Sequence, residues 1–444
     1  MRSLMRVLVE PSDYVLRNAG DMAMMYVAIS RLAAAWPDAL IQVLTADTNR
    51  LAEFCPAATP LMAPDPGQFS ESVSRRISPI ARQLRELPIA KQLKELLLRN
   101  ETARRRLWPL IKFAGGVRDC GTPLRLALPP ALIDSISRAD LMVVTGMGGV
   151  TDAFPGYAQG LLERIEQALA LKKPVFMLGQ GIGPLDRPEL RSKAAAVLPR
   201  VTFIALREGR SGIPLLRSLG VAPQRMMVTG DDAIELADAS GFANGGRGLG
   251  VNLRFAEYAE TDSTFVSECG EILQRSARKF EAPMVPIPIS SVPGEEDAVT
   301  IQLLTAGYSE SSDGGIEVNT PFRVINQIKS CRIVFAGSYH AAVFALSLGV
   351  PVVCLAKSHY YRDKFLGLAE LFGAGCIVIL GREPNWKSHL ANALERAWHG
   401  ADQLKPLLLA AAERQLLLSR SAYQRVFEIV SATIVSKSGN LCGR

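Results

Sequence analysis

The chain has 444 residues, 48% of them hydrophobic and 21% charged, and these proportions exclude a disordered or collagen-like protein. The length predicts two or three domains, and two fit best. The net charge of +7 leaves three readings open: an anionic substrate, a membrane surface or a solvated face. No apolar run reaches the ~18 residues of a membrane helix and no signal-peptide pattern is present, so we expect a cytoplasmic protein.

Short apolar segments alternate with amphipathic ones through residues 1–240. Helices are expected over about Asp21–Trp36, Ala158–Leu171 and Pro188–Val197. The expected strands are rich in Val, Ile, Leu or Met: Met5–Val9, Ile41–Thr45, Leu141–Thr145, Val175–Leu178, Phe203–Leu206 and Met226–Val228. Continuous apolar strands covered by helices on both faces predict a parallel, doubly wound α/β domain.

A basic segment of about residues 64–129 interrupts this alternation. Residues 71–120 contain 12 Lys and Arg against 5 Asp and Glu, with a stripe of Leu and Ile. One interpretation is an inserted helical hairpin on the protein surface. The other is a cationic amphipathic arm that contacts a polyanionic acceptor or the inner face of the membrane.

A second series of the same kind follows the Gly-rich segment Gly241–Gly248, which is the expected linker. Its expected strands are Gly248–Leu253, Met284–Ile287, Ile333–Ala336, Val352–Leu355 and Ile377–Leu380. Residues 249–402 therefore predict a second Rossmann-like domain. Residues 403–435 read as one or two helices that could pack back on the first domain. Two such domains bind ligands between the carboxyl ends of their strands.

Metal binding is not expected. The seven cysteines form no CxxC pair, and the four histidines form no zinc motif. Reduced thiols in a core explain the cysteines better.

Three glycine clusters follow expected strands, at residues 18–21, 146–152 and 179–184. Glycine at a strand end lets the backbone approach a ligand and present amide groups to an anion, although a tight turn explains any single cluster. None satisfies the dinucleotide fingerprint, since Thr151 replaces its third glycine. The candidate binding residues in these clusters are Asn18, Gly20, Asp21, Gly148, Gly149, Asp152 and Gly181.

His340 stands at an expected helix start. A strand ends at Gly337, Ser338 is a suitable N-cap, and His340 falls in the first turn. A helix N-terminus attracts phosphate or carboxylate, and a histidine there can bind or protonate an anionic leaving group. The alternative is a capping or core histidine. Further cations follow strands at Arg207 and in Lys357–Lys364.

Seven motifs in order resemble the polysaccharide pyruvyl transferase family: NAGD (18–21), GMGGVTD (146–152), GQGIGP (179–184), LREGRS (206–211), TGDDA (229–233), SYHAAVFALSLGVP (338–351) and YRDKF (361–365). The resemblance runs from Asn18 to about Leu366, outside the basic insert. It implies a two-domain fold similar to GT-B glycosyltransferases. It also implies transfer of pyruvate from phosphoenolpyruvate to two sugar hydroxyls as a ketal, on a cell-surface polysaccharide or a lipid-linked precursor. No cofactor and no nucleic-acid partner are expected.

The resemblance also implies roles for single residues. Arg207 matches the family arginine that meets phosphoenolpyruvate, and His340 matches the catalytic histidine, a general acid. Asp231 matches the acidic residue of a DPAF-like motif, and it or Asp232 is the candidate base. A helix N-cap is the alternative role of either aspartate.

One departure from the family pattern concerns the donor site. Many members carry Arg two positions before the histidine, where this chain has Ser338. The remaining candidate ligands are Tyr339 and three cations that could replace the arginine, namely Lys357, Arg362 and Lys364.

Two other functions fit the same sequence. A nucleotide-sugar glycosyltransferase would share the architecture, because a fold alone does not fix the chemistry. A non-catalytic carbohydrate-binding relative would keep the fold without turnover.

Overall fold

The computed structural model describes residues 4–63, 128–241, 245–293, 295–308 and 313–439. The expected basic insert lies outside the described residues except for positions 128 and 129, and so do residues 242–244 of the expected linker. The elements below belong to one compact unit formed by residues 1–62 and 131–444. No helix in the described part of the chain combines the length and the apolar character needed to cross a bilayer.

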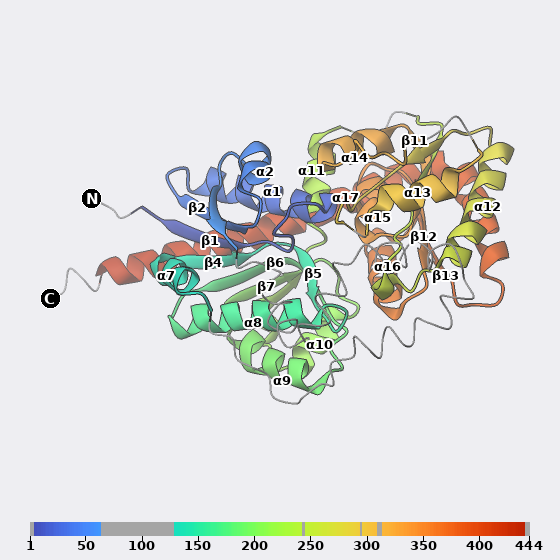
Figure 1. Cartoon of the computed structure of the whole chain (residues 1–444). Coiled ribbons are helices and arrows are strands. Elements are labelled where there is room, and N and C mark those ends of the chain that lie inside the picture. The colour runs from blue at the N-terminus through green and yellow to red at the C-terminus, as the bar shows by residue number, and fades with distance from the viewer. Residues whose placement is uncertain (1–3, 64–127, 242–244, 294, 309–312, 440–444) are drawn as a thin grey trace, which may run out of the picture. The chain divides into compact units, whose positions relative to one another are not determined.

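The first sheet has eight parallel strands, in the order β3-β2-β1-β4-β6-β7-β8 with β5 paired to β6 (Figure 1). Their bounds are β1 Arg6–Glu10, β2 Leu40–Thr45, β3 Thr59–Met62, β4 Leu141–Val144, β5 Met147–Val150, β6 Val175–Ile182, β7 Phe203–Leu206 and β8 Met226–Val228. The central strands β4 and β7 are fully buried because their sequences are continuously apolar, whereas edge strand β3 is mostly exposed.

The helices of this half are α1 Ala19–Ala35, α2 Thr48–Phe54, α7 Pro130–Arg138, α8 Pro155–Ala170, α9 Pro188–Val197, α10 Gly212–Ser218 and α11 Ala233–Ala239. Single 3-10 turns lie at Leu198–Arg200 and Pro223–Arg225. Helix α1 begins at Ala19 because the side-chain oxygen of Asn18 accepts the amide protons of Gly20 and Asp21.

The second sheet is also parallel, with the order β10-β9-β11-β12-β13. Its strands are β9 Gly248–Asn252, β10 Met284–Pro286, β11 Cys331–Ala336, β12 Val352–Ala356 and β13 Cys376–Leu380. Its helices are α12 Ser263–Lys279, α13 Asp297–Thr305, α14 Pro321–Lys329, α15 Tyr339–Ser347 and α16 His359–Phe372, with a 3-10 turn at Glu257–Ala259.

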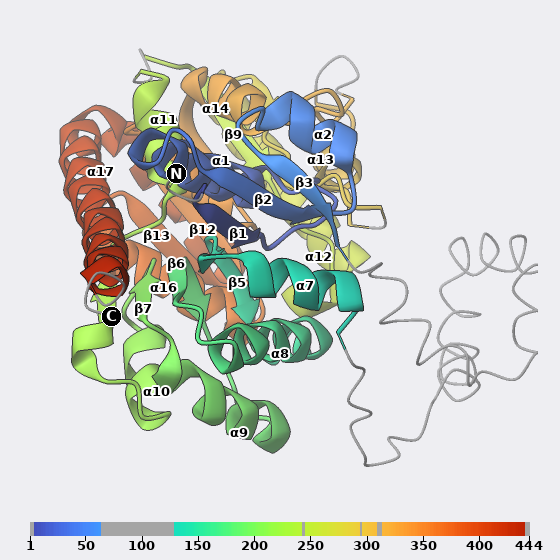
Figure 2. The ribbon, with the colours of Figure 1, turned by 90° about the vertical axis from the view of Figure 1, so that its left-hand side faces the viewer.

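Helix α17, Trp386–Gly439, spans 54 residues and runs past both sheets (Figures 1 and 2). The sequence predicted helix only from residue 403, and the helix begins 17 residues earlier. Leu390 and Leu394 pack in the core of the second sheet, whereas Tyr423 and Val426 pack with the strands of the first. The hydroxyl of Tyr423 also donates to buried Asp232 at 2.9 Å. One helix therefore contributes to the cores of both halves.

The glycine clusters at 146–149 and 179–181 lie largely within strands. Residues 147–150 form β5, and residues 179–182 complete β6. A tight turn, the alternative explanation of these clusters, does not apply to these stretches, because both pair with neighbouring strands, with shifts of register there. Only the cluster at 18–21 opens a helix directly, as expected.

Each sheet reverses its strand order once. Strands β2 and β4 flank β1, and strands β10 and β11 flank β9. Ligand sites in open α/β sheets lie outside the carboxyl ends of strands at such switch points. The segments that leave β1, β9 and β11 carry Asn18, Arg254 and Ser338, and all three line one pocket.

Candidate active site

A pocket of about 260 Å³ is lined by side chains from both sheets. Nine of the predicted site residues line it: Asn18, Asp21, Gly148, Gly149, Arg207, Ser338, Tyr339, His340 and Lys364. Sequence reasoning did not select several others, among them Arg254, Tyr258, Tyr360 and Tyr361. The pocket therefore combines cationic and aromatic side chains.

Arg207 follows β7 and is only 2% exposed. Its guanidinium lies over the ring of Tyr339, 4.2 Å from the ring centroid. Its Nη1 is 3.5 Å from Oδ2 of Asp231, an ion-pair distance that is too long for a good hydrogen bond. Within the described residues, Nε and Nη1 have no hydrogen-bond partner. A buried guanidinium with unused donors is suited to bind an anion.

His340 is the second residue of α15, and its imidazole is held between two elements. Its Nε2 lies 3.5 Å from Oδ2 of Asp231 and has no hydrogen-bond partner in the described chain. On its other side lies Gly20, where any Cβ would overlap the imidazole ring. Gly20 therefore permits α1 to approach the histidine, which is a packing role that the sequence did not reveal.

Asp231 lies behind Arg207 and His340 and does not line the pocket. Its Oδ1 accepts the backbone N–H of Ala233 at 2.9 Å, so it supports the start of α11. Burial raises the pKa of Asp231, but neighbouring His340 and Arg207 outweigh this effect and the pKa stays below its usual value. Asp231 is thus an anion that orients two pocket residues.

Lys364, on α16, is partly buried in the pocket wall and donates a hydrogen bond to the hydroxyl of Tyr360. That hydroxyl in turn donates to the carbonyl of Gly148 at 3.2 Å. Burial, together with the charge of Arg207, lowers the pKa of Lys364 well below its usual value. No described carboxylate forms an ion pair with this lysine.

Two predicted glycines make room for these cations. A Cβ at Gly148 would lie 2.7 Å from Nη2 of Arg207 and closer still to Nζ of Lys364. A Cβ at Gly181 would lie 2.8 Å from Nε of Arg207. Both distances are shorter than real Cβ contacts allow, so a side chain at either position would displace the cation.

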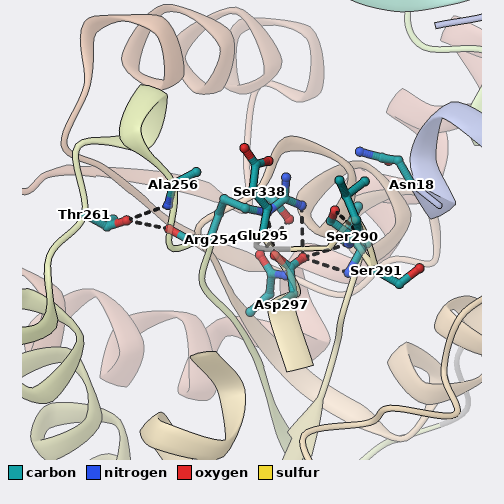
Figure 3. Close-up of polar contacts among 12 residues, drawn as sticks. Asn18, Arg254, Ala256, Thr261, Ser290, Ser291, Glu295, Asp297 and Ser338 are labelled. Carbon is teal, nitrogen blue, oxygen red and sulfur yellow. Dashed lines mark hydrogen bonds and ion pairs between the residues drawn. The ribbon is translucent and has the colours of Figure 1, made fainter. Parts of the chain in front are cut away.

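A second buried arginine, Arg254, lines the pocket but is fully paired (Figure 3). Its Nε and Nη2 donate to Asp297 at 2.5 and 3.0 Å, and its Nη1 donates to Tyr258 at 2.8 Å. Asp297 also accepts the amide protons of Ile289 and Ser290. Asp297 raises the pKa of Arg254 well above its usual value against the opposing effect of burial.

Ser338 precedes α15, but its side chain does not cap the helix as predicted. Its hydroxyl donates instead to Oδ1 of Asn252 at 2.6 Å, and Asn252 donates to Asp297. Neighbouring Tyr339 has a buried hydroxyl with no partner among the described residues. Burial raises the pKa of this phenol, so it remains a neutral donor.

Six predicted residues do not line the pocket: Gly20, Gly181 and Asp231, described above, and Asp152, Lys357 and Arg362. Asp152 accepts the amide protons of Asp186 and Arg187. Lys357 pairs with Asp262 at 2.7 Å, and Arg362 pairs with Asp363 at 2.9 Å. Of the three cations that could replace the family arginine, only Lys364 lines the pocket. Elsewhere in the described chain, no three His, Cys, Asp or Glu side chains form a group that could hold a metal.

Solved structures show what this fold resembles. At 13% identity and a TM-score of 0.55, the chain is similar to a Listeria monocytogenes structure assigned as a UDP-N-acetylglucosamine 2-epimerase, covering 96% of this chain and 97% of that one. S. aureus MnaA, solved with UDP, is 12% identical with a TM-score of 0.52 and the same coverages. Such similarity establishes the two-domain, GT-B-like α/β architecture and no activity.

Sequence comparisons identify the family. Over 294 residues the chain is 23% identical to the amylovoran biosynthesis protein AmsJ of Erwinia amylovora, covering 61% of this chain and 69% of that protein. The family profile of polysaccharide pyruvyl transferases matches residues 18–359, which include Arg207, Asp231 and His340. The chain therefore belongs to the polysaccharide pyruvyl transferase family.

Proposed function

We propose that this protein transfers pyruvate from phosphoenolpyruvate to two hydroxyls of a sugar, as a ketal, on an exopolysaccharide or its lipid-linked precursor. Family membership and the relative in amylovoran biosynthesis support a polysaccharide substrate. One observation supports phosphoenolpyruvate as the pyruvate donor. Arg207, His340 and Lys364 line the same pocket, and the first two have nitrogen atoms without a hydrogen-bond partner among the described residues. A small trianion needs such a group of donors.

The proposed chemistry requires one acid, and two sugar hydroxyls each lose a proton as they bond to C2. His340 would donate a proton to the methylene carbon of phosphoenolpyruvate, which makes the adjacent C2 electrophilic. A sugar hydroxyl then bonds to C2 and releases its proton to a base. The bond from C2 to the phosphate oxygen breaks, and the second hydroxyl closes the ketal as its own proton leaves. The products are the ketal and inorganic phosphate.

The surroundings of His340 suit this role. Asp231 lies 3.5 Å from Nε2 of His340 and its pKa is lowered, so a carboxylate faces the ring nitrogen that would donate the proton. Arg207 would hold the charge of the leaving phosphate, because its unused Nε and Nη1 are buried. The pocket has room for a small donor.

The test is ligand binding followed by turnover. Phosphoenolpyruvate at 100 times its dissociation constant should stabilise the fold by about 2.7 kcal/mol, which raises the melting temperature. Incubation with a saccharide acceptor should then release phosphate and add one pyruvate, less one water, to the acceptor mass. Stabilisation by a UDP- or GDP-sugar alone would instead indicate a glycosyltransferase. No stabilisation by any of them would favour a non-catalytic relative.

A further inference from the structure

Lys364 and Arg207 are neighbouring basic side chains, and no described carboxylate forms an ion pair with both of them. Their terminal nitrogens both lie within 2.7 Å of one point, the position of a Cβ at Gly148, so they are less than twice that distance apart. Two full positive charges so close in a pocket repel each other. An anion that enters between them would remove the repulsion.

The acidic groups around Lys364 do not balance it. Glu208, beside β7, accepts hydrogen bonds from the amide and hydroxyl of Ser211. Asp231 faces Arg207 and His340, and Asp21 of α1 lies across the pocket. The direct partner of Lys364 is the neutral hydroxyl of Tyr360. These surroundings favour the neutral amine of Lys364, since burial and the charge of Arg207 lower its pKa well below the usual value.

We propose that Lys364 and Arg207 together bind the phosphate of the donor, and that Lys364 takes up a proton when this phosphate enters. The identity of the pyruvate donor in this inference rests on the proposed function, whereas the binding of a phosphate group does not. A phosphate dianion carries twice the charge of a carboxylate, so it favours the protonated lysine more strongly. Lys364 would thus supply the positive charge that Ser338 does not.

Proton uptake gives the affinity a defined pH dependence. In this proposal Lys364 is neutral in the free site and charged in the complex, so its pKa would rise on binding. Affinity for phosphate must then fall as the pH rises through the interval between the two pKa values. At pH 8 the phosphate of phosphoenolpyruvate is almost fully dianionic and inorganic phosphate is mostly so, and uptake of about one proton there therefore reports a protein group.

The experiment is calorimetric titration at pH 8 in buffers of different ionisation enthalpy. Inorganic phosphate, phosphoenolpyruvate and pyruvate are titrated into the full chain. We expect uptake of about one proton with the two phosphate-bearing ligands and none with pyruvate. Lys364→Met should lose the uptake and weaken phosphate binding about 10- to 100-fold, whereas Lys364→Arg should keep more of the affinity without uptake.

Two controls separate Lys364 from its neighbours. Lys357→Met removes a lysine that pairs with Asp262 outside the pocket, and it should bind like the wild type. His340→Asn should retain the uptake. Melting curves verify that each variant is folded.

Unchanged proton uptake and affinity in Lys364→Met would overturn the inference. Binding of phosphate but not of phosphoenolpyruvate, with uptake lost in that variant, would uphold the anion site and contradict the proposed donor.

Discussion

Arg207 and Arg254 are both buried arginines of one pocket, yet their surroundings differ. Every nitrogen of the Arg254 guanidinium has a protein acceptor, and two of them share the carboxylate of Asp297. Arg207 has an aspartate only at 3.5 Å and keeps two nitrogens without a partner. Burial of a charged group is costly unless it is paired. From this difference we infer that Arg254 stabilises the fold, and we propose that Arg207 binds a ligand.

The two aspartates that face these arginines, Asp297 and Asp231, differ in the same way. Asp297 connects Arg254 to β9 through Asn252 and to the segment after β10 through Ile289 and Ser290 (Figure 3). Asp231 instead faces two pocket side chains, Arg207 and His340, at longer distances. We therefore expect substitutions at the first network to reduce stability and substitutions at the second to reduce activity.

The largest effect is expected at His340. His340→Asn removes the proposed acid while it keeps a side chain of similar shape, so kcat should fall about 10²- to 10⁴-fold with little change in melting temperature. Phosphate release in the presence of acceptor measures it. His389→Asn, at an exposed histidine near Glu383, is the control and should keep full activity. Equal kcat in the two variants would assign His340 to packing.

Asp297→Ala should destabilise the protein by about 3–5 kcal/mol, because it leaves the buried charge of Arg254 without a partner. Urea unfolding followed by circular dichroism measures the loss. Asp402→Ala removes a carboxylate that pairs with Arg332 and is 80% exposed, so it should leave the stability nearly unchanged. Similar losses of unfolding free energy in the two variants would contradict the structural role assigned to Arg254.

Gly148→Ala should have a smaller effect, confined to binding. The added methyl would meet the flexible ends of Lys364 and Arg207, which can move aside without unfolding the chain. We expect affinity for phosphoenolpyruvate to fall about 10-fold, equivalent to about 1.4 kcal/mol. Gly156→Ala is the matched control, since no atom lies within 4 Å of its added Cβ. Unchanged affinity in Gly148→Ala would show that Lys364 and Arg207 do not bind phosphoenolpyruvate.

The architecture could be predicted because most strands contain a continuous apolar segment. Even the helix start at His340 follows from local signals, namely a strand, a glycine and a polar residue in succession. The strand character of residues 147–150 and 179–182 could not be read in this way, because glycines favour turns locally and tertiary pairing overrides that preference.

The site was predicted less completely, for a physical reason. Arg254 stands two residues after a strand, as Arg207 stands one residue after another, and this placement was an available signal. Its pairing with Asp297, 43 residues away, is what distinguishes the two arginines, and no local pattern carries that information. Tyr360 lies within a charged stretch, and no local pattern shows that its hydroxyl joins Lys364 to Gly148.

The most direct test compares Arg207→Met with the wild type in a thermal-shift titration with phosphoenolpyruvate. The account predicts that the wild type is stabilised by the ligand. It also predicts that the variant melts within a few degrees of the unliganded wild type, and that its affinity is at least about 100-fold weaker. An equal ligand-induced shift in both proteins would contradict the claim that Arg207 is reserved for the donor.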